Sequence, residues 1–87
     1  MKTRSATHVT LGRVLYRARR DRDLSQEALA AIAGVGAKHL GEIERANHDP
    51  RYSTLLKLAT ALDIELSDLL ARAEARTRGE TREGEPA

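Results

Sequence analysis

Residues 34–36, Gly-Val-Gly, interrupt a stretch that otherwise has the periodicity of an α-helix on both sides. Ser25 is a suitable N-cap for the helix before this break, and Leu24 and Leu29 have the spacing of a hydrophobic staple. The first glycine of the break stands where that helix must end in a left-handed residue, a conformation that glycine adopts without strain. Residues 25–45 are therefore predicted to form two short helices joined by a tight turn, the arrangement called helix-turn-helix.

Helical spacing of apolar residues recurs in three other segments. The first begins at Thr10, an expected N-cap, and ends near Asp21. The second begins at Pro50 after the expected cap Asp49, and the third begins at or just before Ser67. Leucine, alanine, isoleucine and valine supply nearly all the apolar side chains, which suits close-packed helices better than a sheet. The predicted fold is all-α, with five short helices around one core.

The helical patterns divide the chain into three parts. We expect residues 1–9 to form a flexible arm, because they show no periodicity. Residues 10–75 form the predicted domain, which is long enough for a single modest core. Residues 76–87 are charged, and alanine is their only hydrophobic residue type, so we expect a disordered tail.

The composition argues against several classes of protein. The chain has no cysteine, which excludes a disulfide framework and fits a reducing cytosol. No apolar run approaches the length of a membrane span and the N-terminus lacks a signal-like segment, so a cytoplasmic protein without membrane contact is expected. His8, His39 and His48 lack the spacing of metal ligands, and the chain has no phosphate loop or nucleophile–base set. We therefore expect no metal, no cofactor and no enzymatic activity.

Charge is unevenly distributed along the chain. Residues 1–22 hold seven basic side chains and one acidic one, whereas residues 23–71 hold four basic and eight acidic ones. A basic end on an acidic domain permits binding to nucleic acid, and it is equally consistent with a solvated helix face.

Three segments, taken in order, resemble the lambda-repressor-like DNA-binding domains of the Cro/cI type, also known as XRE-type helix-turn-helix proteins. They read LGRVLYRARRDRDLSQEALA, AGVGAKHLGEIERA and DPRYSTLLKLATALDIELSDLL, and the resemblance covers about residues 11–71. It rests on Leu-Ser-Gln-Glu-x-Leu-Ala at the second helix, Ile-Glu-Arg at the end of the third and Leu-x-x-Leu-Ala-x-x-Leu in the fourth. The resemblance implies a lambda-repressor-like fold whose third helix, residues 37–45, enters the major groove of double-stranded DNA.

The resemblance also implies roles for individual residues at matching positions. Base edges would be read from the third helix by Ala37, Lys38, His39 and Glu42. The DNA backbone would be contacted by Gln26 at the start of the second helix and by Arg19, Arg45, Asn47, His48 and Arg51. Arg19 and Glu44 match a charged pair that ties the first helix to the third in similar proteins.

Several of these residues have a second interpretation. Lys38 either donates to guanine or pairs with Glu42 one turn on, and Glu42 either accepts from cytosine or repels wrong sequences. Ala37 either touches a thymine methyl group or is merely small enough to let the helix approach. Most relatives carry glycine where Ala46 stands, so either Ala46 or Asn47 is expected to take a positive φ.

The predicted function is sequence-specific DNA binding by a transcriptional regulator. One small module covers little DNA, so a homodimer on a pseudo-palindromic site is expected. The apolar surface expected at the dimer interface lies on the fifth helix, at Leu66, Leu69 and Leu70. The alternative is an antitoxin or adaptor of the same fold that acts mainly by binding a partner protein. The near-neutral charge of residues 36–51 favours that alternative.

Overall fold

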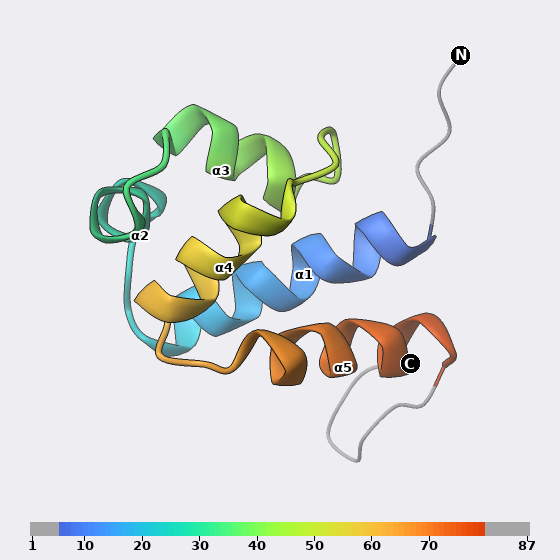
Figure 1. Ribbon diagram of the computed structural model, residues 1–87. Helices are drawn as coiled ribbons and strands as arrows, with labels where there is room; N and C mark the ends of the chain where they lie inside the picture. The colour runs from blue at the N-terminus through green and yellow to red at the C-terminus, as the bar shows by residue number, and fades with distance from the viewer. Residues whose placement is uncertain (1–5, 80–87) are drawn as a thin grey trace.

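Five short helices make up the part of the chain that the structure describes. The computed structural model describes residues 6–79 of the 87-residue chain. The helices are α1 (Ala6–Asp21), α2 (Gln26–Ala33), α3 (Ala37–Glu44), α4 (Tyr52–Ala61) and α5 (Leu66–Thr77). Figure 1 shows α2 and α3 on one side of the molecule and α5 on the opposite side, with α1 and α4 between them. Residues 6–79 contain no strand, and the predicted all-α fold class is confirmed.

Each helix contributes to a single core. The largest side chains that are fully buried are Leu15, Leu29, Leu40, Ile43, Leu58, Leu62 and Leu69. The inward stripe predicted for the fourth helix is confirmed, because all four of its members are buried: Leu55, Leu58, Ala59 and Leu62. Burying such side chains is the dominant favourable term in folding, and here it requires every helix to be in place.

Three of the four connections between helices follow one three-residue pattern, at residues 23–25, 34–36 and 63–65. The first residue of each has a positive φ that ends the preceding helix, at Asp23 (58°), Gly34 (76°) and Asp63 (58°). The second residue is apolar and packs partly against the core, and the third is the N-cap of the next helix. The expected cap at Ser25 is confirmed, since its Oγ accepts from the N–H of Ala28 at 3.0 Å.

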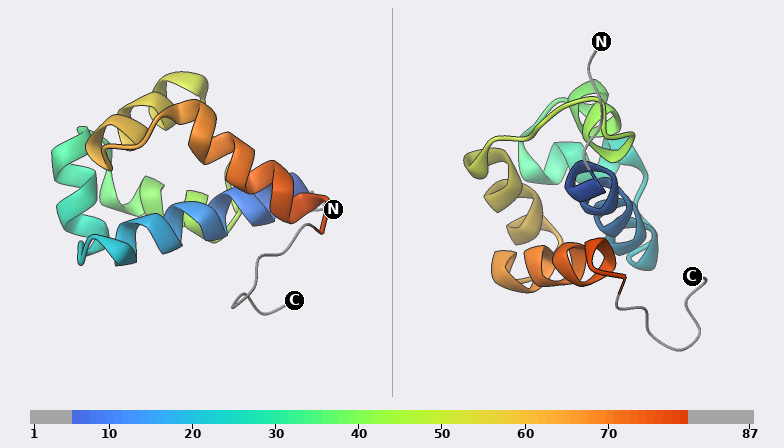
Figure 2. Two further views of the ribbon diagram at one scale, coloured as in Figure 1. Left: turned by 90° about the horizontal axis from the view of Figure 1, so that it is seen from below. Right: turned by 90° about the vertical axis from the view of Figure 1, so that its right-hand side faces the viewer.

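α1 and α5 run antiparallel, side by side (Figure 2). Thr10 Oγ1 and Thr77 Oγ1 form a hydrogen bond of 2.7 Å that joins the beginning of α1 to the end of α5. The prediction that the first helix begins at Thr10 is wrong, because α1 begins at Ala6. No proline or glycine interrupts the added turn. Residues 6–9 of the expected arm are therefore helical, and residues 76 and 77 of the expected tail belong to α5. The expectations for residues 1–5 and 80–87 lie outside the described residues.

The left-handed residue at the end of α3 is Ala46, with a φ of 63°. Asn47, the other candidate, does not take a positive φ. The N–H groups of Ala46 and Asn47 donate to the carbonyl oxygens of Ile43 and Glu42, at 3.0 and 2.8 Å, so the end of the helix is satisfied. For a non-glycine residue the left-handed conformation costs on the order of 1 kcal/mol.

α4 begins later than predicted. The sequence suggested Asp49 as the cap and Pro50 as the first helical residue, but the N-cap is Arg51 and the first helical residue is Tyr52. Arg51 is extended, with a ψ of 156°. The connection has to reach from the end of α3 to the start of α4 (Figure 2, right). Extended residues cover about twice the distance per residue that a helix covers, so the segment before α4 stays extended.

α1 crosses the C-terminal end of α3 at Gly12. A Cβ atom placed on Gly12 would lie 2.5 Å from the carbonyl oxygen of Glu44 and 2.8 Å from that of Ile43. Both oxygens belong to the backbone and cannot rotate away. The absence of a side chain at Gly12 is therefore what lets α1 approach α3 so closely, a requirement that the sequence did not reveal.

Candidate nucleic-acid interface

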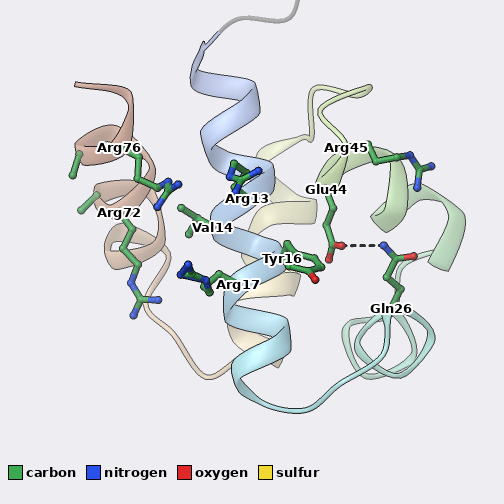
Figure 3. Close-up of a pocket in the computed structure, with 11 residues that line it drawn as sticks. Arg13, Val14, Tyr16, Arg17, Gln26, Glu44, Arg45, Arg72 and Arg76 are labelled. Atoms are coloured by element: carbon green, nitrogen blue, oxygen red, sulfur yellow. Dashed lines mark hydrogen bonds between the residues drawn. The ribbon is translucent and has the colours of Figure 1, made fainter. Parts of the chain in front are cut away.

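A buried network of hydrogen bonds ties α3 to α1 and α2. Arg19 donates to both carboxylate oxygens of Glu44, from Nε to Oε2 at 2.8 Å and from Nη2 to Oε1 at 3.0 Å. Gln26, the first residue of α2, donates from Nε2 to Oε1 of Glu44 at 2.9 Å (Figure 3). Arg19 Nη1 also donates to the carbonyl oxygen of Leu24 at 2.8 Å. The pair expected between Arg19 and Glu44 is present, and it holds α3 against two other helices.

The two charged members of this network are almost completely buried. The side chains of Arg19 and Glu44 expose 6% and 4% of their surface. Hydrogen bonding to Glu44 raises the pKa of the Arg19 guanidinium above its ordinary value, while desolvation acts in the opposite direction. The expectation that Arg19 contacts the DNA backbone is wrong, because its guanidinium faces Glu44 and Leu24 inside the protein. Arg19 is a positioning residue for α3.

The outward side of α3 and the loop after it carry most of the residues expected to contact DNA. The exposed members of this set are Lys38, Arg45, Asn47, His48 and Arg51, and the half-buried ones are Gln26, Ala37, His39 and Glu42. The rings of His39 and His48 lie 5.4 Å apart in an edge-to-face arrangement, so α3 and the loop meet there. Ala37 packs partly against the core, which leaves only part of its methyl group available to a base.

Glu42 interacts with residues that follow it rather than with Lys38. Arg45 Nη2 donates to Glu42 Oε2 at 3.2 Å, and the side chain of Asn47 hydrogen-bonds to the same carboxylate. The hydrogen bond with Asn47 is the largest cause that lowers the pKa of Glu42 below its ordinary value, and the charge of Arg45 adds to it against the effect of desolvation. Within residues 6–79, Glu42 forms no ion pair with Lys38, so the expected alternative pairing is not present.

Replacing Asn47 by alanine is expected to raise the pKa of Glu42 towards its ordinary value, because the largest cause of the lowering is removed. Since the folded-state pKa is lowered, the contribution of Glu42 to stability is present at neutral pH. It is lost as the pH falls below the usual glutamate range and through that lowered pKa. An NMR titration of the Glu42 carboxylate would measure the change, with Lys57→Ala as a control. An unchanged titration in Asn47→Ala would contradict the assignment of the hydrogen bond.

The apolar surface expected at a dimer interface is smaller than predicted. Leu69 has no exposed surface and belongs to the core, so the expectation that it lies in a dimer interface is wrong. The inward stripe of α5 consists of Leu69 and Ala73, four residues apart on the face that packs against the rest of the protein. Leu66 is partly buried against the core, and Leu70 exposes 37% of its surface.

A cleft that the sequence did not predict lies beside Gln26 and Arg45 and has a volume of about 890 Å³ (Figure 3). Its lining includes two arginines from α1 and two from α5: Arg13, Arg17, Arg72 and Arg76. Gln26, Glu44 and Arg45 line its other end. The four-residue spacing within each arginine pair is visible in the sequence. The sequence does not show that α1 and α5 lie side by side, and it is this arrangement that brings the two pairs together.

Residues 6–79 hold no group of three or more histidine, cysteine, aspartate or glutamate side chains arranged to bind a metal ion. None of the helices in this range has the length and apolar character that crossing a bilayer requires.

Comparison with known proteins identifies related sequences and a related fold. The family model described as Helix-turn-helix matches residues 15–69. The chain is 42% identical over 50 residues to control protein C.SmaI of Serratia marcescens, across 58% of this chain and 60% of that protein. It is 36% identical over 62 residues to the immunity repressor protein of Bacillus phage phi105, across 71% of this chain and 43% of the phage protein. The chain thus spans less than two thirds of the length of either relative.

A solved structure is similar over most of the chain. It is the crystal structure of the restriction-modification controller protein C.AhdI from Aeromonas hydrophila, with a TM-score of 0.73 and 40% sequence identity. The similarity covers 75% of this chain and 98% of that one.

Proposed function

The chain belongs to the helix-turn-helix family, and we propose that it is a sequence-specific DNA-binding transcriptional regulator that acts in the cytoplasm. α3 lies in the major groove in this proposal, and α2 crosses above the backbone. The observation that carries the proposal is the buried network of Arg19, Glu44 and Gln26, which holds α3 in one orientation. Base reading needs such a fixed helix, because side chains must meet base edges at hydrogen-bond distance.

Different residues serve different parts of the contact. Base edges are proposed to meet Lys38, His39 and Glu42, with Ala37 close enough for a methyl contact. The backbone is proposed to meet Gln26, Arg45, Asn47, His48 and Arg51. Lys38 is exposed and forms no ion pair with Glu42, so its ammonium group is available to a guanine. The proposed role is binding rather than catalysis.

A second copy of the chain is part of the proposal. One module buries a limited area of DNA, and two modules related by a two-fold axis read a pseudo-palindromic site with half-sites about one helical turn apart. α5 supplies the proposed contact through the exposed side of Leu70 and the exposed part of Leu66. The names of the controller and repressor relatives support regulation of transcription as the role.

A fluorescence anisotropy titration with the DNA immediately upstream of the chain's own gene tests this proposal. Tight binding that falls steeply with salt, together with discrimination against a scrambled duplex, is the expected result. Absence of binding to either duplex, or binding that does not depend on salt, would contradict the proposal. That outcome would favour the adaptor or antitoxin that acts by binding a protein.

Two alanine variants separate base reading from backbone contact. Lys38→Ala is expected to relax sequence preference at one position of each half-site and to reduce discrimination there by about 1–3 kcal/mol. Arg45→Ala is expected to weaken binding to all sequences alike and to lower the salt slope by about 1. Competition titrations with single-base variants of the site provide the measurement. If both variants keep the parent's sequence preference and salt slope, α3 is not placed in the groove as proposed.

A further inference from the structure

The cleft that runs from α5 across α1 to Gln26 and Arg45 holds four arginines on the two helices outside the helix-turn-helix. Arg13 and Arg17 lie on α1, and Arg72 and Arg76 lie on the neighbouring α5 (Figure 3). Residues four apart on a helix are separated by about 6 Å along its axis, so each helix presents two guanidinium groups in a row. Within residues 6–79 no ion pair involves Arg13, Arg17 or Arg72. Cations gathered in this way repel one another, and an anion bound among them relieves the repulsion.

We infer that this arginine cleft is a second DNA-contact surface, which holds backbone phosphates beyond the base pairs that α3 reads. The inference rests on the proposed function. Gln26 and Arg45, two of the proposed backbone contacts, line the same cleft as the arginines. A strand that passes these two residues is therefore directed along the cleft towards α1 and α5. Each strand of DNA carries one charge per about 3.4 Å of helix axis, so each arginine pair spans about two phosphates.

The charge of the reading surface explains why a second surface is needed. Glu44 is buried against Arg19, so the surface of residues 36–51 carries three basic and two acidic side chains, and Arg45 is already paired with Glu42. Phosphate contacts supply a large share of the affinity of most DNA-binding proteins. A helix that reads bases without net positive charge therefore depends on basic groups elsewhere in the protein. The arginine cleft supplies four of them next to the residues at which the backbone first meets the protein.

Salt-dependent titrations of the full chain test this inference. The probes are labelled duplexes of mixed sequence, about 20 and about 30 base pairs long. The shorter one is about as long as two half-sites. Arg72→Ala/Arg76→Ala is expected to lower the slope of log affinity against log salt by about 2, and to bind about tenfold more weakly at low salt. The parent is expected to bind the longer duplex more tightly, because that duplex supplies phosphates beyond the two half-sites, and this variant should lose that preference. Arg72→Lys/Arg76→Lys should retain most of the slope, because a lysine still offers a point charge to a phosphate.

Lys57 provides a matched control, since it is exposed on α4 and does not line the cleft. Arg72→Ala is expected to lower the slope by about 1, whereas Lys57→Ala, which removes the same charge, should leave it unchanged. If the parent binds DNA and the arginine variants keep its slope, the inference is overturned while the proposed function stands. An acidic protein segment would then be the better occupant of the cleft. If the parent binds neither duplex, the proposed function and the inference fail together.

Discussion

Replacing Glu44 by alanine is expected to lower the free energy of unfolding by about 3–5 kcal/mol. Glu44 accepts two hydrogen bonds from Arg19 and one from Gln26, and the Arg19 side chain is only 6% exposed. Without the carboxylate, a guanidinium remains buried without its counter-charge. Small domains have a total stability of about 5–15 kcal/mol, so this change removes a large part of it. Urea denaturation followed by circular dichroism measures the loss.

Two variants separate the cost of leaving the Arg19 guanidinium buried and unpaired from the cost of losing side-chain contacts. Arg19→Met/Glu44→Leu removes both charges and is expected to recover much of the stability, because no unpaired charge is left inside. Because the network also positions α3, this double variant is expected to fold but to bind DNA more weakly than the parent. Glu42→Ala removes a carboxylate from the same helix at a more exposed position and should lower the free energy of unfolding much less than Glu44→Ala does. If Glu44→Ala and Glu42→Ala unfold at the same urea concentration, the buried pair does not stabilise the protein more than the exposed one does.

Most features that depend on nearby residues could be predicted from the sequence, although the local rule that placed a cap at Asp49 was wrong. The cap at Ser25 and the left-handed Gly34 follow from local conformational preferences, which the fold leaves unchanged. The stripe on α4 follows from periodicity alone. The pairing of Arg19 with Glu44 came instead from the resemblance to a known family, since no local rule joins residues 25 positions apart.

Features that depend on how helices meet could not be predicted. Leu69 and Leu70 are both apolar, and only the packing of α5 decides that Leu69 enters the core while Leu70 remains exposed. α1 and α5 lie side by side although they are far apart in sequence, and Thr10 is hydrogen-bonded to Thr77. The arginine cleft depends on the same neighbourhood, because its charges come from both ends of the described chain. In each case the deciding contact joins segments that are distant in sequence.

Replacing Gly12 by alanine is expected to lower the free energy of unfolding by about 2–3 kcal/mol, although alanine is favoured over glycine in a helix by about 1 kcal/mol. The new Cβ would lie 2.5 Å from the carbonyl oxygen of Glu44, so α1 must move away from α3. Gly12 and Arg19 are seven residues apart and lie on the same face of α1. The movement therefore also pulls Arg19 away from Glu44, and the loss of stability should come with weaker DNA binding.

Replacing Gly41 by alanine is the matched control, because it is expected to raise the free energy of unfolding. A Cβ on Gly41 would lie 3.2 Å from Nη1 of Arg45 and 3.3 Å from Oε1 of Gln26, and both atoms are at the ends of flexible side chains. These side chains can shift, so Gly41→Ala should gain up to about 1 kcal/mol from helix propensity. Thermal unfolding of the two variants beside the parent measures the difference. If Gly12→Ala unfolds at the same temperature as Gly41→Ala, the close approach of α1 to α3 does not constrain residue 12. That result would contradict both the expected clash of residue 12 with the Glu44 carbonyl and its expected effect on the Arg19–Glu44 pair.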